Sequence, residues 1–274
     1  MLAAVGLMCT SMLLRAVAWH AILRAALPDA LPRFVDAMQG TTIGVLMSAT
    51  LPARLGEPSR ALIVARRLGR SRERLPVVLG TLVSQTLLNV LALVLLGAVV
   101  FATAGLFAGR QQALVVYALA PFAVLCAVLV APAPLRRGLM VFRRPRLCLA
   151  ATGAQLGAWA LQWLACLVLL AALHVDGAGA GAAAAVLLAV NVTAVLPVTP
   201  SNLGVFQAAC VAVLGGAYGV DAAQALGYGI VLQAVEIATA VVMGAPALVK
   251  EGLTWREVRR HALHAAPVSP AAPA

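Results

Sequence analysis

Two apolar stretches of this chain end in the same kind of Pro- and Gly-rich phrase. Residues 51–57 read LPARLGE, and residues 196–204 read LPVTPSNLG. Each phrase breaks a hydrophobic run where a membrane-spanning helix would continue, and lipid tolerates such irregular backbone only around a protein-lined or watery cavity. Broken segments at corresponding places in two halves of a chain are typical of transporters built from inverted repeats. We therefore expect two hairpin tips beside a substrate path, formed by Pro52, Gly56, Pro197, Pro200 and Gly204.

The composition is that of an integral membrane protein. Hydrophobic residues make up 63% of the 274 residues and charged residues only 11%, and the mean hydropathy is +0.99, as in polytopic membrane proteins. The net charge of +11 comes from Arg residues that cluster between apolar runs. There they orient the chain and contact lipid phosphates, so no nucleic acid is expected as a partner. The five Cys and four His residues show no metal-ligand spacing, so we expect neither a metal nor a cofactor.

Five segments are long enough to cross a bilayer, whose hydrocarbon core of about 30 Å requires about 20 helical residues. They are residues 1–23, 76–103, 112–132, 148–173 and 224–248. Two further apolar regions are cut short by the Pro/Gly phrases, and we interpret them as re-entrant hairpins at about 39–69 and 183–218. The predicted fold is an all-α polytopic membrane protein with inverted repeats of transmembrane helices.

The charge distribution predicts the orientation in the membrane. Arg residues crowd the loops 54–74 and 133–146 and the C-terminal segment, whereas the connections 103–111, 173–182 and 216–223 carry a single charge each. The Arg-rich segments should be cytoplasmic. The hairpin at 39–69 then enters from the cytoplasm, and the hairpin at 183–218 begins and ends on the outer side.

The two halves are expected to form one domain. The second half contains span, span, hairpin and span, and the first half lacks the opening span, so we expect a further helix upstream of residue 1. Residues 1–260 are expected to form a single transmembrane domain, followed by a disordered cytoplasmic tail at 261–274. A signal peptide at 1–23 is the weaker alternative, because Arg15 interrupts the run and no small-residue cleavage site is evident.

Both phrases resemble signatures of a known family. Residues 51–60, LPARLGEPSR, are similar to the first signature of the lysylphosphatidylglycerol synthase/flippase transmembrane family, and residues 196–207, LPVTPSNLGVFQ, to its second. The likeness extends over about residues 15–250. It implies a polytopic membrane domain that moves, or helps to move, amphiphilic lipids with polar headgroups. The best-known members flip aminoacylated phosphatidylglycerol, and others are linked to isoprenoid-phosphate sugar carriers.

The chain departs from the family pattern at four polar positions. The family has Glu where this chain has Gln207, often an Arg near Gln233, and commonly a charged Arg/Asp pair near Gln85 and Asn89. Amides in all four places indicate that neutral hydrogen-bonded pairs replace ion pairs, which costs little when both partners change together. The aminoacyl-transferase domain of the long members is absent from these 274 residues. We therefore expect no lipid aminoacylation and no enzymatic activity.

Charged residues at the first tip are candidates for binding a lipid headgroup. Arg54 and Arg60 can grip a phosphate with charge-assisted hydrogen bonds, aided by free amides at the helix start after Gly56. Glu57 and Arg60 lie one helical turn apart, so an ion pair that locks the hairpin is an equally weighted alternative.

Uncharged donors and acceptors stand at the second tip, where they can contact a headgroup or a glycan: Thr199, Ser201, Asn202 and Gln207. Ser201 or Asn202 can instead cap the helix that follows. Capping is the expected role of at least one of these residues.

Glu236 is the only acid of the last predicted span, and Gln233 lies one turn earlier on the same face. An intramembrane carboxylate can serve as a proton-coupling site or can pair with an Arg. We expect pairing, with Arg54, Arg60 or Arg15 as the partner.

The leading functional hypothesis is a flippase-like protein of the bacterial plasma membrane. It would translocate a phosphate-bearing lipid, such as an anionic phospholipid or an isoprenoid-phosphate carrier, between leaflets. The alternative is a non-transporting scaffold or regulator that binds a cell-envelope glycosyltransferase or lipid-modifying enzyme. A polar chamber of lipid size would favour transport, and a dry, tightly packed centre would favour the scaffold. A homo-oligomer is compatible with either hypothesis.

Overall fold

A computed structural model describes residues 1–50, 56–104, 133–193 and 203–250 of the chain. This described part is all-helical, without strands, and four of its helices are long and apolar enough to cross a membrane. These are α1 (Leu2–Ala26), α4 (Ser71–Ala104), α7 (Pro145–Ala172) and α10 (Ala222–Lys250). The expectation of an all-α integral membrane protein is therefore confirmed. The predicted span 112–132 and the tail 261–274 lie outside the described residues.

Four shorter helices pack as two pairs. Helix α2 (Phe34–Thr50) contacts α3 (Gly56–Arg67), and α8 (Ala180–Thr193) contacts α9 (Val205–Tyr218). Helices of 12 to 17 residues are about 18–26 Å long, which is less than the thickness of the hydrocarbon core. The links 51–55 and 194–202 lie outside the described residues. So do seven of the predicted site and tip residues: Pro52, Arg54, Pro197, Thr199, Pro200, Ser201 and Asn202.

Helix α2 begins earlier than the expected hairpin boundary at residue 39. Its first turn contains Asp36, and the side chain of Asp36 accepts a hydrogen bond from the backbone N–H of Arg33 at 3.0 Å. This satisfies one of the donors that a helix start leaves free. Residues 34–38, which the expected hairpin excluded, therefore form the beginning of the helix.

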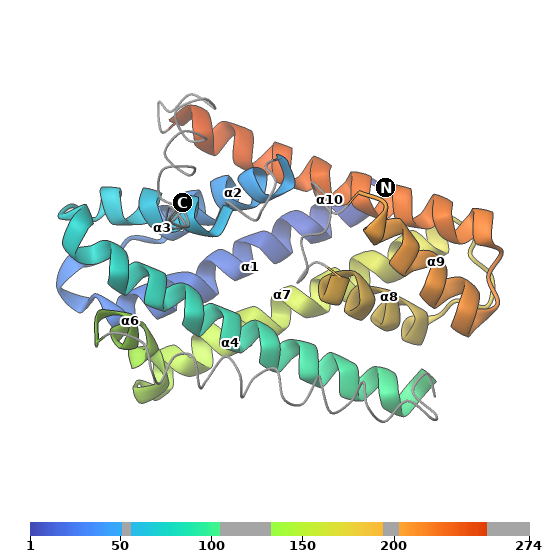
Figure 1. Ribbon diagram of the computed structural model, residues 1–274, viewed down its shortest axis with the longest axis horizontal. Coiled ribbons are helices and arrows are strands. Elements are labelled where there is room, and N and C mark those ends of the chain that lie inside the picture. Colours follow the sequence, from blue (N-terminus) through green and yellow to red (C-terminus); the bar gives the residue numbers. More distant parts are fainter. Residues whose placement is uncertain (51–55, 105–132, 194–202, 251–274) are drawn as a thin grey trace, which may run out of the picture.

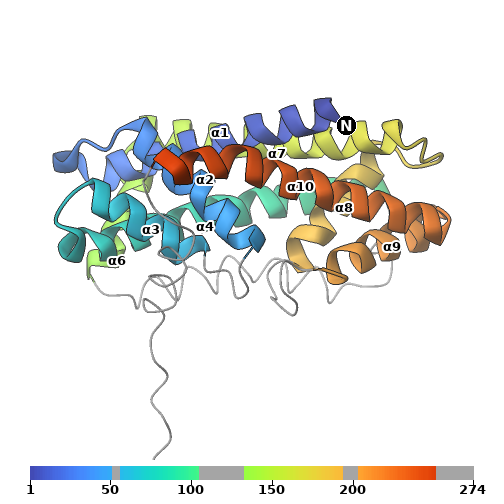
Figure 2. The ribbon, with the colours of Figure 1, turned by 90° about the horizontal axis from the view of Figure 1, so that it is seen from above.

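The two pairs lie at opposite ends of the molecule. In Figures 1 and 2, α2 and α3 lie at the end where α1 finishes and α4 starts, and α8 and α9 lie at the end where α7 finishes and α10 starts. Figure 1 also shows that α7 runs opposite to α1 and that α10 runs opposite to α4. We call α1–α4 the first series and α7–α10 the second series; the first long helix of the second series runs opposite to that of the first, and so does the last.

One end of this arrangement carries most of the positive charge. Basic residues occupy the last turns of three helices that finish there: Arg24 of α1, Arg66 and Arg67 of α3, and Lys250 of α10. The segments 54–74 and 133–146, expected as loops, are largely helical. The second contains α6 (Ala133–Arg137) and the 3-10 helix η2 (Gly138–Arg143), and a further 3-10 helix, η1 (Pro28–Ala30), follows α1.

Small residues allow the helices to approach closely. Helix α1 packs along α7, and its buried face includes Ala4, Ala16 and Ala18. Close contact between apolar helices replaces the hydrophobic driving force that lipid does not supply. At the start of α3, a Cβ atom on Gly56 would overlap the carbonyl oxygen of Gly44 in α2 and the hydroxyl of Ser48. The α2–α3 pair therefore requires glycine at position 56.

We predict that Gly56→Ala separates α2 from α3 and destabilises the protein by about 2 kcal/mol, because an added methyl group overpacks the contact. The measurement is the apparent Tm of the detergent-solubilised protein, which should fall by several degrees. Gly153→Ala in α7 is the control, because a Cβ atom at Gly153 would meet nothing within 4 Å. Equal Tm values for the two variants would show that the close contact does not exist.

Candidate functional site

Arg60 is the centre of a buried polar network near the start of α3. Its Nη2 donates to Oε1 of Gln85 in α4 at 2.7 Å and to the hydroxyl of Thr41 in α2 at 3.4 Å. The guanidinium carbon lies 4.1 Å from the centroid of the Trp19 ring in α1. A planar guanidinium can donate hydrogen bonds in its plane while stacking on an aromatic face. One side chain therefore connects all four helices of the first series.

Glu57 is the charged partner of Arg60, but it is held loosely. The Arg60 Nη1 atom lies 3.3 Å from a carboxylate oxygen of Glu57, and the side chains are 9% and 57% exposed, respectively. Thus the locking ion pair, one of the two sequence interpretations, is present in the structure. A pair with one half-exposed partner contributes little to stability. An exposed carboxylate within a membrane-spanning region faces water or headgroups rather than hydrocarbon.

Arg15 extends the network from α1 towards α7. Its Nη2 donates to Oε1 of Gln162 at 2.7 Å, and its backbone carbonyl accepts a hydrogen bond from Nε2 of Gln85 at 3.3 Å. The guanidinium carbon lies 5.8 Å from the centroid of the Trp159 ring. The Nε atom of Arg15 is buried and has no hydrogen-bond partner among the described residues. Arg15 therefore keeps one donor available.

Glu236 of α10 and Arg15 of α1 lie close enough to attract each other electrostatically. No ion pair within 4.0 Å joins Glu236 to Arg15 or Arg60 in the described part of the chain. Of the three expected partners, Arg15 therefore interacts with Glu236 at longer range, and Arg54 lies outside the described residues.

A second polar cluster joins α4 to α7. The Asn89 side-chain oxygen accepts hydrogen bonds from Nε1 of Trp159 at 3.2 Å and from Nε2 of Gln155. Gln155 is only 1% exposed, and its Oε1 has no partner among the described residues. The sequence analysis did not select Gln155, Gln162 or Trp159. The signal that could have found the two Gln residues is an uncharged amide inside an apolar span.

In the second series, a hydrogen bond between two amide side chains corresponds to the hydrogen bond that a charged Arg makes in the first series. Nε2 of Gln207 in α9 donates to Oε1 of Gln233 in α10, as expected for a neutral replacement of an ion pair. Oε1 of Gln207 also accepts a hydrogen bond from the backbone N–H of Gly204 at 2.8 Å. The Gly204 residue, with φ of +84°, is the N-cap of α9, and the Gln207 side chain caps the helix start. The expectation that at least one polar residue of this tip has a capping role is therefore confirmed for Gln207, while Ser201 and Asn202 lie outside the described residues. Glycine adopts this left-handed φ without strain, and Gln207 folds back onto it.

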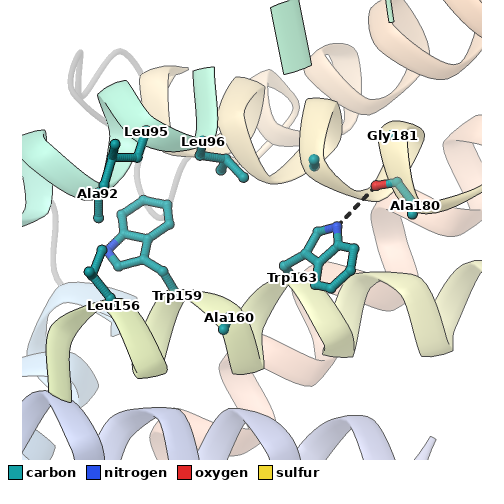
Figure 3. Close-up of a pocket in the computed structure, with 10 residues that line it drawn as sticks. Ala92, Leu95, Leu96, Leu156, Trp159, Ala160, Trp163, Ala180 and Gly181 are labelled. Carbon is teal, nitrogen blue, oxygen red and sulfur yellow. Dashed lines mark hydrogen bonds between the residues drawn. The ribbon is translucent and has the colours of Figure 1, made fainter. Parts of the chain in front are cut away.

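An apolar groove of about 340 Å³ lies between α4, α7 and α8, close to the polar network. Figure 3 shows the rings of Trp159 and Trp163 along it, with Nε1 of Trp163 donating to the carbonyl of Ala180 at 3.0 Å. Most of its other lining residues are small or aliphatic: Ala92, Leu95, Leu96, Leu156, Ala160, Gly181 and Ala184. Trp159 lines this groove and also contacts Asn89 and Arg15. One ring is therefore shared by the apolar groove and the polar network.

The structure thus brings together some of the predicted residues. Arg15, Glu57, Arg60 and Gln85 form one network, to which Asn89 is joined through Trp159. Gln207 and Gln233 form a separate pair. Nothing in these contacts tests a role in binding lipid, which stays a prediction.

We predict that Arg60→Ala destabilises the protein by about 3 kcal/mol, because the buried Gln85 oxygen loses its donor and the Trp19 face loses its cation. Glu57→Gln should cost less than about 1 kcal/mol, because its carboxylate is half-exposed. Chemical denaturation in detergent measures both values. Arg66→Ala, an exposed residue at the other end of α3, is the control, and equal losses for positions 60 and 66 would contradict the assignment.

We further predict that Gln207→Glu and Gln233→Arg each destabilise the protein by about 2 kcal/mol, because each leaves one charge unpaired among buried groups. The double variant should recover at least about 1 kcal/mol of the summed loss by forming an ion pair. A double-mutant cycle of Tm or denaturation measures this coupling. Strictly additive losses would show that these two side chains do not meet.

Comparison with known proteins supports the resemblance to a single family. The family model described as the lysylphosphatidylglycerol synthase TM region matches residues 1–244. No curated protein and no solved structure matches the chain. The matched residues include all four long helices except the end of α10 and both pairs of short helices. The chain therefore belongs to the family of the lysylphosphatidylglycerol synthase transmembrane region.

Proposed function

We propose that this protein is flippase-like and translocates, or assists the translocation of, a phosphate-bearing lipid between the leaflets of a bacterial plasma membrane. The lipid would be a phospholipid or an isoprenoid-phosphate carrier. The proposal assigns it a transport role without covalent catalysis, and it places the Arg-rich end in the cytoplasm. Family membership supports the general class, and the remaining argument comes from the geometry of the site.

The proposed architecture is a pair of inverted repeats, each with a re-entrant hairpin. The reversed series of helices supports this, because α2–α3 and α8–α9 approach the centre from opposite ends. Equivalent residues also recur at one spacing: Gly204 follows Gly56 by 148 positions, and Gln233 follows Gln85 by the same 148. In this family of architectures the substrate site lies where the repeats meet.

The observation that carries the proposal is the unequal burial of Arg60 and Glu57. Arg60 is held from three sides by Gln85, Thr41 and Trp19, whereas its acidic partner is half-exposed and 3.3 Å away. A phosphate can replace the half-exposed Glu57 carboxylate at this fixed guanidinium, because both anions accept charge-assisted hydrogen bonds from Arg. The free Nε of Arg15 adds a second donor near this position. In this proposal Glu57 returns to Arg60 after the headgroup leaves.

The apolar groove supplies a path for the hydrocarbon chain. An amphiphilic lipid needs an apolar surface beside its headgroup site, and the groove is joined to the polar network through Trp159. Its lining is apolar except for the two indole N–H groups. The hairpin-tip residues Arg54, Thr199, Ser201 and Asn202, together with Gln207, would complete the headgroup path from the cytoplasmic to the outer side.

A second function is favoured by one observation. Buried polar side chains of both series already have partners inside the protein, as in the Gln207–Gln233 pair and the Gln155–Asn89 hydrogen bond. Polar groups that are already hydrogen-bonded to one another have less capacity to bind a lipid headgroup. Such a centre suits a scaffold that holds a cell-envelope enzyme and moves no lipid. The transport measurement separates the two functions.

We predict that the purified protein in proteoliposomes exchanges fluorescent phosphatidylglycerol or polyprenyl phosphate between leaflets. Arg60→Lys should slow the exchange at least about tenfold, because a point-charge ammonium cannot hold Gln85, Thr41 and a phosphate together. Arg66→Gln removes one charge from the far end of α3 and should leave the rate unchanged. Folded wild-type protein that exchanges neither lipid would overturn the transport function and favour the scaffold.

A further inference from the structure

The Arg-bearing segment formed by α6 and η2 is rigidly attached to the helices beside it. The carbonyl oxygen of Gly138 accepts a hydrogen bond from the hydroxyl of Ser84 in α4 at 2.7 Å. A Cβ atom on Gly138 would overlap the backbone of Gly80, so the two chains touch through glycine. Val141 is fully buried in the same apolar cluster as Trp19 of α1. This segment is therefore a fixed surface and not a loosely held loop.

Three Arg residues of this segment line a pocket of about 820 Å³: Arg136, Arg137 and Arg143. Among the described residues, the rest of its lining is apolar and includes Leu87, Met140 and Phe142, and none of these lining residues is acidic. The three Arg side chains are exposed. Within the part of the chain that the structure describes, none of the three forms an ion pair or a side-chain hydrogen bond. The pocket thus combines three available cations with an apolar wall.

The pocket lies beside the half of α4 that begins at the Arg-rich end of the protein. The Arg-bearing segment contacts α4 at Gly80 and Ser84, both in the first half of this 34-residue helix. Leu87 lies near the midpoint of the helix. The pocket therefore extends from the Arg-bearing segment towards the middle of α4, so its cations and its apolar wall lie next to each other along a helix long enough to cross the bilayer.

We propose that this pocket binds the phosphate of an anionic phospholipid from the leaflet at the Arg-rich end of the protein. The guanidinium groups of Arg136, Arg137 and Arg143 would hold the phosphate through charge-assisted hydrogen bonds. The first part of an acyl chain would lie against Leu87 and Phe142. This site shares no residue with the Arg60 network, so it goes beyond the proposed transport function and does not depend on it. A free inorganic phosphate could use the cations but not the apolar wall.

The test uses the full chain in nanodiscs of phosphatidylcholine that contain a trace of spin-labelled phosphatidylglycerol. The fraction of label immobilised by the protein gives its preference for the anionic lipid. The triple variant Arg136→Gln/Arg137→Gln/Arg143→Gln should weaken this preference about tenfold or more, because it removes all the guanidinium groups that would contact the phosphate directly. The exchange rate of lipids between leaflets should stay that of the wild type, which separates this site from the transport path.

The matched control is Arg66→Gln/Arg70→Gln/Arg72→Gln, which removes the same charge from the same end of the protein outside the pocket. It should change the preference less than about twofold. Equal losses for the two triple variants would overturn the site and assign the preference to the overall charge. Inorganic phosphate added at constant ionic strength should not displace the labelled lipid, and displacement would reassign the pocket to a free anion.

Photocrosslinking keeps the proposal testable if the triple variant is unstable. Wild-type protein with a diazirine-labelled phosphatidylglycerol should form crosslinks within residues 133–143 and near Leu87. Crosslinks confined to other helices would overturn the proposal.

Discussion

A charged guanidinium inside a membrane protein must find its hydrogen-bond acceptors in the protein, because hydrocarbon supplies none. Arg60 meets this requirement through Gln85 and Thr41, and it gains the face of Trp19. These partners come from α4, α2 and α1, so a single buried charge requires the four helices of the first series to meet at one point. The position of the short α2–α3 pair, and with it the exposed Glu57, follows from this requirement.

Backbone contact through glycine is the second constraint. Gly56 lies against Gly44 within the α2–α3 pair, and Gly138 lies against Gly80 where the Arg-bearing segment meets α4. Gly244 brings α10 of the second series against α2 of the first, where a Cβ atom would crowd Leu46. Such close approach allows dispersion contacts and hydrogen bonds to hold helices together in lipid, where burial of apolar surface gains little.

The two series supply different hydrogen-bond donors to the Gln side chain of their last helix. In the first, Gln85 of α4 receives a hydrogen bond from a cation on α3, and in the second Gln233 of α10 receives one from the neutral Gln207 on α9. The second arrangement avoids the desolvation of two charges, at the cost of a weaker interaction. The hydrogen bond at the α2–α3 pair consequently involves a charged donor, and the one at the α8–α9 pair involves a neutral donor. In the proposed transport function, the lipid phosphate is therefore expected to be held mainly by the first series.

The sequence by itself determined the membrane class, the four long helices and the two short pairs, because uninterrupted and interrupted apolar runs differ in length whatever their neighbours are. It also indicated the Glu57–Arg60 pair, since residues three apart on a helix lie on one face. Only the tertiary structure decided that Gln85 serves Arg60, that Trp159 links Arg15 to the groove, and that Gly204 caps α9. These contacts join helices that are far apart in the chain, and their partners depend on how the helices pack. The spacing of residues along the chain does not predict that packing. The length of an apolar run, by contrast, can be counted directly in the sequence.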